Sequence, residues 1–476
     1  MNIFTGILNV FKVIAGQIEL VMGIVVLIGL ILQKKKAVDV TMGVVKAVVG
    51  VMILKQGSTL LQASYRPVMD MIKTAFNITG VVTENYAGMA AINQAIPTLI
   101  GAVPMVMLFG FLLNILLARF GPLKVVFLTA HTMLAFATLT VWLVNWFFNV
   151  EGFPLIVASS LFCGIFWTVM PAWVYNYSKP FVGEAFTLGH ISGTAAIISS
   201  GIGRALGKYN KKNPKFFEET EEEGEQVSRG GSFSKIFNDS TVATFLLMTV
   251  VLGLGAFLSG KDLIQQAAGS TNWIVYALEL GGNFTVGIVV LLTGVRIMIA
   301  ELVPAFKGIS EKVVPGAVPA LDMPVFFPLA PVASVLGFLG AFIGEFLGFA
   351  ILLLTGSPIL MIPGIIATFF DGGVAGVFGF KYGGKKSAVI SGIAVGLVQI
   401  LGGVLFTKLS GLATLGATYG NTDFGSTMAI LVVIMNALKN VWLFVALLIC
   451  IYVIASVLLK KNFETKENYE VDQVEA

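Results

Sequence analysis

The sequence predicts an all-α polytopic membrane protein, and three observations carry this prediction. Of the 476 residues, 57% are hydrophobic and only 12% are charged, and the mean hydropathy is +0.90. Soluble domains carry about 25% charged residues, and a soluble fold of this length exposes too much surface to hide so much apolar area. The 53 glycines and 16 prolines also fit membrane helices, in which both residues are commoner than in soluble ones.

Apolar runs that are long enough to cross a bilayer recur along the chain. Because a span needs about 20 predominantly apolar residues, the first half has candidates near 9–32, 38–60, 97–118, 123–147 and 153–175. The second half has candidates near 240–259, 273–293, 333–355, 358–380, 387–407 and 430–459. We therefore expect about eleven transmembrane helices, the first of which is an uncleaved N-terminal segment.

The distribution of basic residues indicates the orientation. Lysine and arginine gather in short cytoplasmic loops near helix ends. With the N-terminus outside, the residues that fall on the cytoplasmic side are Lys34, Lys35, Lys36, Arg119, Lys124, Lys179, Lys381, Lys385, Lys386, Lys460 and Lys461. Lys261 and Lys408 do not follow this pattern. The sequence therefore favours a protein of the cell membrane with its C-terminus in the cytoplasm.

The chain also resembles itself. A shift of 237 positions matches several pairs without a gap, namely Gly50 with Gly287, Leu54 with Leu291, Gly57 with Gly294, Pro67 with Pro304, Val81 with Val318 and Asn85 with Asp322. We expect a first repeat over 1–203, a charged cytoplasmic loop over 204–238, a second repeat over 239–459 and a disordered polar tail over 460–476. Five spans in the first repeat would start the second from the opposite side, which gives the inverted repeats common in transporters.

Each repeat contains an interrupted segment at a corresponding place. Residues 61–96 are too polar for a lipid-exposed span, and residues 309–331 carry five prolines, which forbid a continuous helix. Residues 180–206 are apolar but short, and we expect them to lie at the interface or to dip into the protein. Because broken backbone at membrane depth is tolerated only inside protein or around water, paired interruptions point to a substrate site.

Polar side chains inside apolar segments are the candidate site residues. Asp322 lies in the proline-broken element and matches Asn85 of the other repeat. The chain has two histidines, His131 and His190, whose imidazoles can donate and accept hydrogen bonds with a hydroxylated solute; an interhelical hydrogen bond is the alternative for each. Further candidates are Ser58 and Tyr86, and Glu301, for which a substrate contact and a structural role are equally open.

Several kinds of site are not predicted. The stretch "GFKYGGKKS" at 379–387 nearly matches a phosphate-binding loop, but Lys386 occupies the Ser/Thr position and no strand is expected before it. The sequence has no metal-binding pattern, no paired nucleophile and base, and no nucleotide-binding domain. We therefore expect no catalytic residue, no metal, no cofactor and no nucleic-acid partner.

Seven stretches follow one another in the order of a known family: "GVMILKQGSTLL", "TENYAGM", "LTAHTML", "FTLGHISG", "GVRIMIAELVPAFKGIS", "VPGAVPALD" and "MIPGIIATFFDGGVAGVFGFKYGG". Over nearly its whole length the chain thus resembles the ascorbate-type membrane permease subunit, IIC, of the sugar phosphotransferase system. The resemblance implies a homodimer with a substrate-holding core domain, a dimerisation domain and an elevator-type movement. It also implies that a separate IIB protein, supplied by a IIA protein, phosphorylates the solute, so that the phosphoryl donor residue is not on this chain.

The resemblance carries over as solute-binding residues Ser58, Asn85, Tyr86, His131, His190 and Asp322, with Glu301 in support. The chain departs from the ascorbate pattern where glutamines are expected, since it has Ala135 and Phe136, and then Ile191, after the two histidines. Loss of amide groups from a site built to hydrogen-bond a polyol should weaken binding of that polyol. We therefore expect L-ascorbate or, more in keeping with the missing amides, a related sugar acid, pentose or polyol. The alternative is a proton- or sodium-coupled secondary transporter. Genes for IIA and IIB proteins next to the gene of this chain would favour the phosphotransferase system over this alternative.

Overall fold

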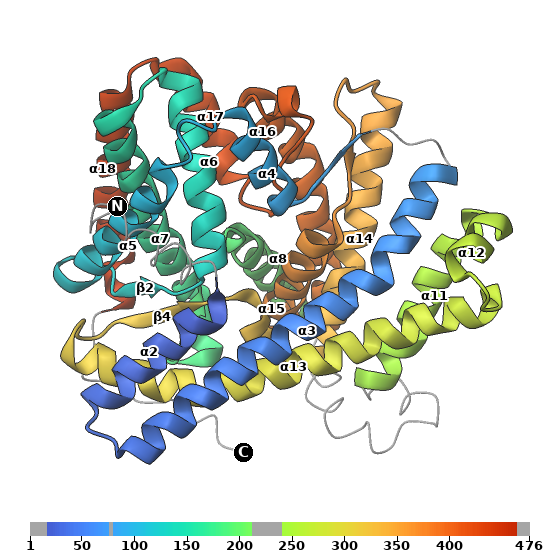
Figure 1. The fold of residues 1–476 in the computed structure, drawn as a ribbon, viewed down its shortest axis with the longest axis horizontal. Coiled ribbons are helices and arrows are strands. Elements are labelled where there is room, and N and C mark those ends of the chain that lie inside the picture. The colour runs from blue at the N-terminus through green and yellow to red at the C-terminus, as the bar shows by residue number, and fades with distance from the viewer. Residues whose placement is uncertain (1–16, 76–79, 212–239, 464–476) are drawn as a thin grey trace.

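The computed structural model describes residues 17–75, 80–211 and 240–463, and helices dominate it (Figure 1). Over these residues eight helices are long and apolar enough to cross a membrane. A ninth span results if α11 (Ser240–Leu258) and α12 (Lys261–Ala268), bent by 116°, are taken together. The all-α class is therefore confirmed. This count covers only the described residues, and it takes residues 366–409, which cover most of two of the predicted spans, as one helix.

Two of the predicted spans correspond to described helices of other lengths. Of the span expected over 9–32, the structure describes α2 (Ile18–Leu32), which has 15 residues. The span expected over 430–459 is divided into α17 (Thr427–Leu438) and α18 (Val441–Leu459). The division falls at Lys439, whose φ of 50° is incompatible with a continuing right-handed helix.

The long helices α3 (Ala37–Ala75) and α13 (Trp273–Lys312) pack side by side and form one group with α2, α11 and α12 (Figure 1). Their crossing is glycine-lined. A Cβ added at Gly57 would lie 2.4 Å from Leu291 N, and one added at Gly294 would lie 2.4 Å from Leu54 N. The 237-residue shift converts the first contact into the second, while the repeat itself stays a prediction.

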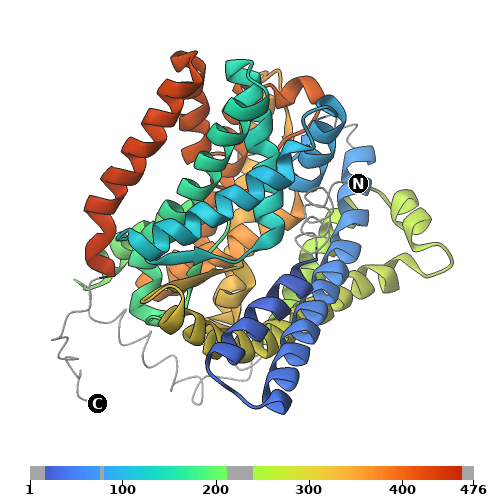
Figure 2. The ribbon, with the colours of Figure 1, turned by 60° about the vertical axis from the view of Figure 1, so that its left-hand side comes forward.

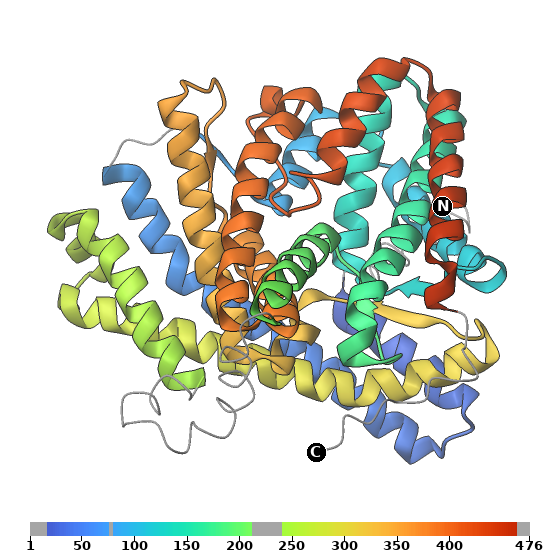
Figure 3. The same cartoon turned by 180° about the vertical axis from the view of Figure 1, so that it is seen from behind.

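The other helices form a second group, which lies on one side of the α3–α13 pair (Figures 2 and 3). Within it α14 packs on α15, α15 on α8, and α7 on α5, α6 and α18. Its members are α4 (Asn85–Ala95), α5 (Ala102–Phe120), α6 (Ala130–Phe148), α7 (Gly152–Val182), α8 (Gly193–Lys211), the 3-10 helix η1 (Met323–Leu329), α14 (Pro331–Leu354), α15 (Ile365–Leu397), the π-helix η2 (Val398–Gly402), α16 (Gly403–Leu409), η3 (Leu412–Leu415), α17, α18 and η4 (Lys460–Asn462).

Helix α15 reverses direction at Gly384, whose φ of 75° and ψ of −171° are not helical. A Cβ added at Gly376 would lie 3.0 Å from Gly337 Cα, and one at Gly392 would lie 2.1 Å from Gly337 O, so both halves of α15 contact the same glycine of α14. In a straight helix these two positions would be about 24 Å apart. The two spans expected over 358–380 and 387–407 are thus the two halves of this hairpin.

Five short parallel strands join the broken segments, and the sequence analysis did not predict them. β1 (Val81–Val82) pairs with β5 (Met361–Ile362), and β4 (Val318–Leu321) lies between β2 (Val125–Phe127) and β3 (Thr187–Leu188). Such short strands satisfy backbone N–H and C=O groups that interrupted helices leave free inside an apolar protein. Val81 pairs with Met361, and Val318, which the 237-residue shift matches to Val81, pairs with Val125.

The interrupted segments are shorter than expected. Helix α3 runs through Pro67 to Ala75, so the break in 61–96 comes late, before β1 and α4 (Asn85–Ala95). In the second repeat α13 extends to Lys312, and then β4 and the 3-10 helix η1 (Met323–Leu329) carry most of the prolines. Residues 193–211 form α8, which packs on α15 as a segment that enters the protein. Of the charged loop predicted over 204–238, residues 204–211 belong instead to α8. Residues 212–238 of this loop and residues 464–476 of the tail lie outside the described residues.

Candidate functional site

A cavity of about 330 Å³ lies between α3 and the second helix group. Its wall comes from α3, the starts of α4, α6 and η1, the loop after β3, and the first half of α15. The polar residues of this wall are Lys55, Ser58, Thr59, Gln62, Thr83, Glu84, Asn85, His131, Thr132, His190, Asp322 and Asn421. Of the residues predicted from sequence, Ser58, Asn85, His131, His190 and Asp322 therefore line one cavity.

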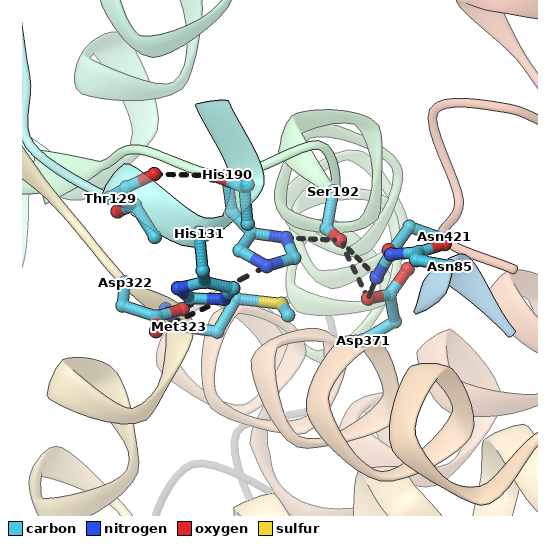
Figure 4. Close-up of polar contacts among 10 residues, drawn as sticks. Asn85, Thr129, His131, His190, Ser192, Asp322, Met323, Asp371 and Asn421 are labelled. Carbon is cyan, nitrogen blue, oxygen red and sulfur yellow. Dashed lines mark hydrogen bonds and ion pairs between the residues drawn. The ribbon is translucent and has the colours of Figure 1, made fainter. Parts of the chain in front are cut away.

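Two histidines and an aspartate meet because each follows a strand of the three-stranded sheet. His131 comes shortly after β2, His190 after β3 and Asp322 directly after β4. Since the strands are parallel, their carboxyl ends share one edge, which is where open parallel sheets place their ligands. Within this trio, His131 Nε2 lies 3.8 Å from Asp322 Oδ2, and His190 Nε2 lies 3.8 Å from Asp322 Oδ1 (Figure 4).

The three side chains differ in exposure. The His131 side chain is 33% exposed, that of Asp322 is 15% exposed, and that of His190 is only 5% exposed. Asp322 Oδ1 also accepts a hydrogen bond of 2.7 Å from Met323 N, which fixes the carboxylate at the start of η1. The trio thus presents ring nitrogens and a carboxylate to the cavity, in a geometry that suits hydroxyl groups of a small solute.

The trio also has donor atoms of the kind that bind transition metals. One ligand atom from each of His131, His190 and Asp322 can be chosen so that all three lie within 4.8 Å of one another. Imidazole and carboxylate together suit zinc and similar divalent ions. No metal was predicted from the sequence, which has no metal-binding pattern.

A second polar cluster lies behind His190, and the sequence analysis did not weigh its members. Asp371 on α15 accepts hydrogen bonds from Ser192 Oγ at 2.6 Å, Asn421 Nδ2 at 2.7 Å, Thr422 N at 2.6 Å and Gln399 Nε2 at 3.2 Å. Asp371, Ser192 and Thr422 are fully buried. The cluster ties the loop after β3 to the loop before α17.

Asn85 joins this cluster to the cavity. Its Oδ1 accepts a 3.0 Å hydrogen bond from Gly420 N, and its Nδ2 donates to Asn421 Oδ1. A neighbouring buried carboxylate, Asp423, accepts hydrogen bonds from Gly193 N at 3.1 Å and Thr194 N at 2.8 Å. Asp423 therefore caps the N-terminus of α8, as acidic side chains at this position commonly do.

Two predicted residues are not placed in the cavity. Glu301 on α13 does not line it and forms an ion pair with Lys46 of α3, with 3.3 Å between Oε1 and Nζ. This contact favours the structural role that the sequence left open. Tyr86 belongs to α4, but its side chain lies outside the described part of the chain. Of the positions that lack the expected glutamines, Ala135 lines the cavity, whereas Phe136 and Ile191 are buried in the apolar core.

The missed residues had a signal in the sequence. Asp371 stands in "ATFFDGGVAG", and Asp423 stands in "YGNTDFGS" beside Asn421. An ionisable residue in an apolar segment is a functional candidate by default, because its burial is costly. The first of these stretches contributed to the family resemblance, but its aspartate was not singled out.

The fold is helical and of the membrane type, and a polar cavity lies where the backbone of two segments is interrupted. These features define the class of the protein as a permease for small solutes. Residues 13–425 match the EIIC-GAT family, described as the PTS system sugar-specific permease component, and the chain belongs to this family. The predicted family is thus confirmed, and the protein is a multi-pass membrane protein. A similar protein is the "Ascorbate-specific PTS system EIIC component" of Mycoplasma pneumoniae (strain ATCC 29342 / M129 / Subtype 1), with 27% identity over 435 residues. The match covers 81% of this chain and 64% of the relative's length.

Proposed function

We propose that the protein imports a small hydroxylated solute, L-ascorbate or a related sugar acid, pentose or polyol. A separate IIB protein, recharged by a IIA protein, phosphorylates the solute as it arrives in the cytoplasm. The observation that carries this proposal is the single cavity in which His131, His190 and Asp322 converge. The name of the Mycoplasma pneumoniae relative, an ascorbate-specific component, supports ascorbate as the first solute to test.

The cavity suits a solute of this class in size and chemistry. Its volume of about 330 Å³ lies at the lower end of the range for small-molecule sites, about 300–1,000 Å³. Hydroxyl, amide, imidazole and carboxylate groups face it beside a few apolar side chains, such as Phe370 and Ala367. This mixture supports recognition of a compact molecule with several hydroxyl groups.

The two helix groups support an elevator-type mechanism. The trio belongs to segments that pack with the second group, whereas Ser58 and Lys55 of the cavity belong to α3 of the first. A movement of the second group along the α3–α13 pair would carry the trio and its solute across the membrane. In this mechanism the second group is the core domain and the first is the dimerisation domain of a homodimer.

Outward apolar side chains on α3 and α13 support the dimerisation role, since Met42, Val49 and Met52 of α3 and Val286 and Val289 of α13 are exposed in the single chain. The inverted arrangement of the repeats, the external N-terminus and the cytoplasmic C-terminus belong to the same proposal. It further assigns the protein to the cell membrane, with no catalytic residue and no cofactor of its own.

A second candidate function is a proton- or sodium-coupled transporter. Buried carboxylates favour it, because Asp371, Asp423 and Glu345 are fully buried and Glu345 Oε1 has no hydrogen-bond partner within the described residues. Glu345 Oε2 accepts a hydrogen bond of 2.5 Å from Thr368, one position from the cavity wall. Such a carboxylate would exchange a proton or bind a cation during transport.

Equilibrium binding to the purified protein tests the solute-binding part of the proposal. Radiolabelled ascorbate is measured first, and unlabelled pentoses, sugar acids and polyols then compete with it. We expect one compound of the panel to bind, and Asp322→Asn and His190→Ala to weaken it by about tenfold or more, since a hydrogen bond to a charged group contributes about 1.5–3 kcal/mol. Binding that both variants retain in full would place the solute elsewhere and overturn the proposal.

A further inference from the structure

The ring of His190 has two faces with different partners. Its Nε2 lies 3.8 Å from Asp322 Oδ1 on the cavity side, and its Nδ1 lies 3.0 Å from Ser192 Oγ on the buried side (Figure 4). Ser192 Oγ in turn lies 2.6 Å from Asp371 Oδ1. Which ring nitrogen carries the proton decides whether His190 donates to the solute or accepts from it.

The backbone sets the direction of the hydrogen bonds in this cluster. Gly420 N can only donate, so the Asn85 atom that it contacts at 3.0 Å is the amide oxygen. The amide nitrogen of Asn85 then faces Asn421 and donates to its oxygen. Consequently the nitrogen of Asn421 faces Ser192 Oγ at 2.9 Å and Asp371 Oδ1 at 2.7 Å, and it donates to both.

Asp371 acts only as an acceptor towards the donors around it. Its Oδ2 accepts hydrogen bonds from Thr422 N at 2.6 Å and from Gln399 Nε2 at 3.2 Å. Its Oδ1 accepts hydrogen bonds from Asn421 Nδ2 and Ser192 Oγ. Donors from the chain thus surround both side-chain oxygens of Asp371. The hydroxyl proton of Ser192 therefore points at Asp371, and the Ser192 oxygen has only lone pairs left for His190.

We propose that Asp371 is a positioning residue that acts through Ser192 to hold His190 in the tautomer with its proton on Nδ1. The Nε2 lone pair then faces the cavity beside the Asp322 carboxylate. This inference rests on the proposed function and names the hydrogen-bonding role of the site: the solute must donate hydroxyl hydrogens to His190 and to Asp322.

The spacing of the two acceptors agrees with this role. A separation of 3.8 Å between His190 Nε2 and Asp322 Oδ1 is too long for a direct hydrogen bond. Neighbouring hydroxyl groups of a polyol can instead donate one proton to each acceptor. A solute in which these hydroxyls are methylated or removed leaves two buried acceptors unpaired and is rejected.

Nitrogen NMR of the imidazole rings tests the inference without any solute. The full chain has only two histidines, so uniform ¹⁵N-histidine labelling of the protein in detergent yields two rings, and His131→Ala assigns them. At neutral pH we expect His190 to show a protonated Nδ1 and a bare Nε2. Ser192→Ala should shift His190 toward the form protonated on Nε2 and leave the His131 spectrum unchanged.

Ser64→Ala is the matched control, because Ser64 is a buried serine of α3 whose hydroxyl donates to the Leu60 carbonyl of its own helix at 2.8 Å. It should change neither ring. Asp371→Asn should act as Ser192→Ala does, and the serine variant decides the question alone if the aspartate variant fails to fold. Protonation of Nε2 in the unsubstituted protein, or an unchanged His190 tautomer in Ser192→Ala, would overturn the inference.

Solute binding gives a second readout. Ser192→Ala should weaken binding of the accepted solute by about tenfold, which corresponds to one hydrogen bond to a buried group, whereas Ser64→Ala should not. If the tautomer is as expected but no hydroxylated solute binds, the proposed function fails and the assignment of the His190 proton stands. If solute binds and the tautomer is the opposite one, only the inference fails.

Discussion

Replacement of Gly294 by alanine should separate the two long helices α3 and α13, of which α3 lines the cavity. The added Cβ would lie 2.4 Å from Leu54 N and 2.6 Å from Gly50 O, and both of these atoms are backbone. Because ordinary contacts between heavy atoms lie at about 3.5–4.0 Å, α3 and α13 must move apart by roughly 1 Å. Overpacking of this kind costs about 1–3 kcal/mol.

Gly282→Ala on the same helix provides the matched control. A Cβ at Gly282 would meet only Phe245 Cε2, at an ordinary 3.5 Å. Both variants gain about the same helix propensity, roughly 1 kcal/mol for Gly→Ala, so their difference isolates the cost of the contact.

Thermal unfolding of the purified protein in detergent measures this difference. We expect the Tm of Gly294→Ala to lie several degrees below that of Gly282→Ala, and solute binding to weaken, because Leu54 and Ser58 of the displaced helix line the cavity. Equal Tm values for the two variants would refute the close packing of α3 on α13.

Three further predictions concern single side chains. Ala135→Gln should lower the Kd for ascorbate by about two- to tenfold, which is the effect of one added neutral hydrogen bond. An unchanged Kd would contradict the position of residue 135 in the cavity wall. Thr83→Val should destabilise the protein by about 1–3 kcal/mol, because the buried N–H of Gly364 donates to Thr83 Oγ1 at 2.7 Å and would lose this partner. An unchanged Tm would contradict this prediction. Glu301→Gln should change the Kd for the solute by less than about twofold, because Glu301 pairs with Lys46 away from the cavity. A loss of affinity as large as that of Asp322→Asn would show that Glu301 contributes to solute binding.

The sequence predicted the features that follow from local composition. Apolar runs indicated the helices, and proline content located the break before Asp322. Matching by 237 residues paired Gly50 with Gly287 and Asn85 with Asp322, and the packing of α3 on α13 agrees with that shift. These features depend on a residue and its near neighbours, so a single sequence contains them.

Features that depend on pairing between distant segments could not be predicted from the sequence. The strands have only two to four residues each, too few for an alternating pattern, and they form because another broken segment lies opposite. The cluster around Asp371 likewise joins residues 192, 399 and 421, which no spacing rule connects. The position of Glu301 also needed tertiary structure, because an apolar helix gives no sign of which neighbour a carboxylate will meet.

The central claim is that the cavity holds a solute that phosphotransferase partners phosphorylate. Uptake of the radiolabelled solute into membrane vesicles tests it most directly, with and without the matching IIA and IIB proteins and a phosphoryl source, and with Asp322→Asn in parallel. We predict that the solute accumulates as its phosphate only when all partners are present, and that Asp322→Asn abolishes this accumulation. Uptake of unmodified solute driven by a proton or sodium gradient, without any partner protein, would contradict the claim.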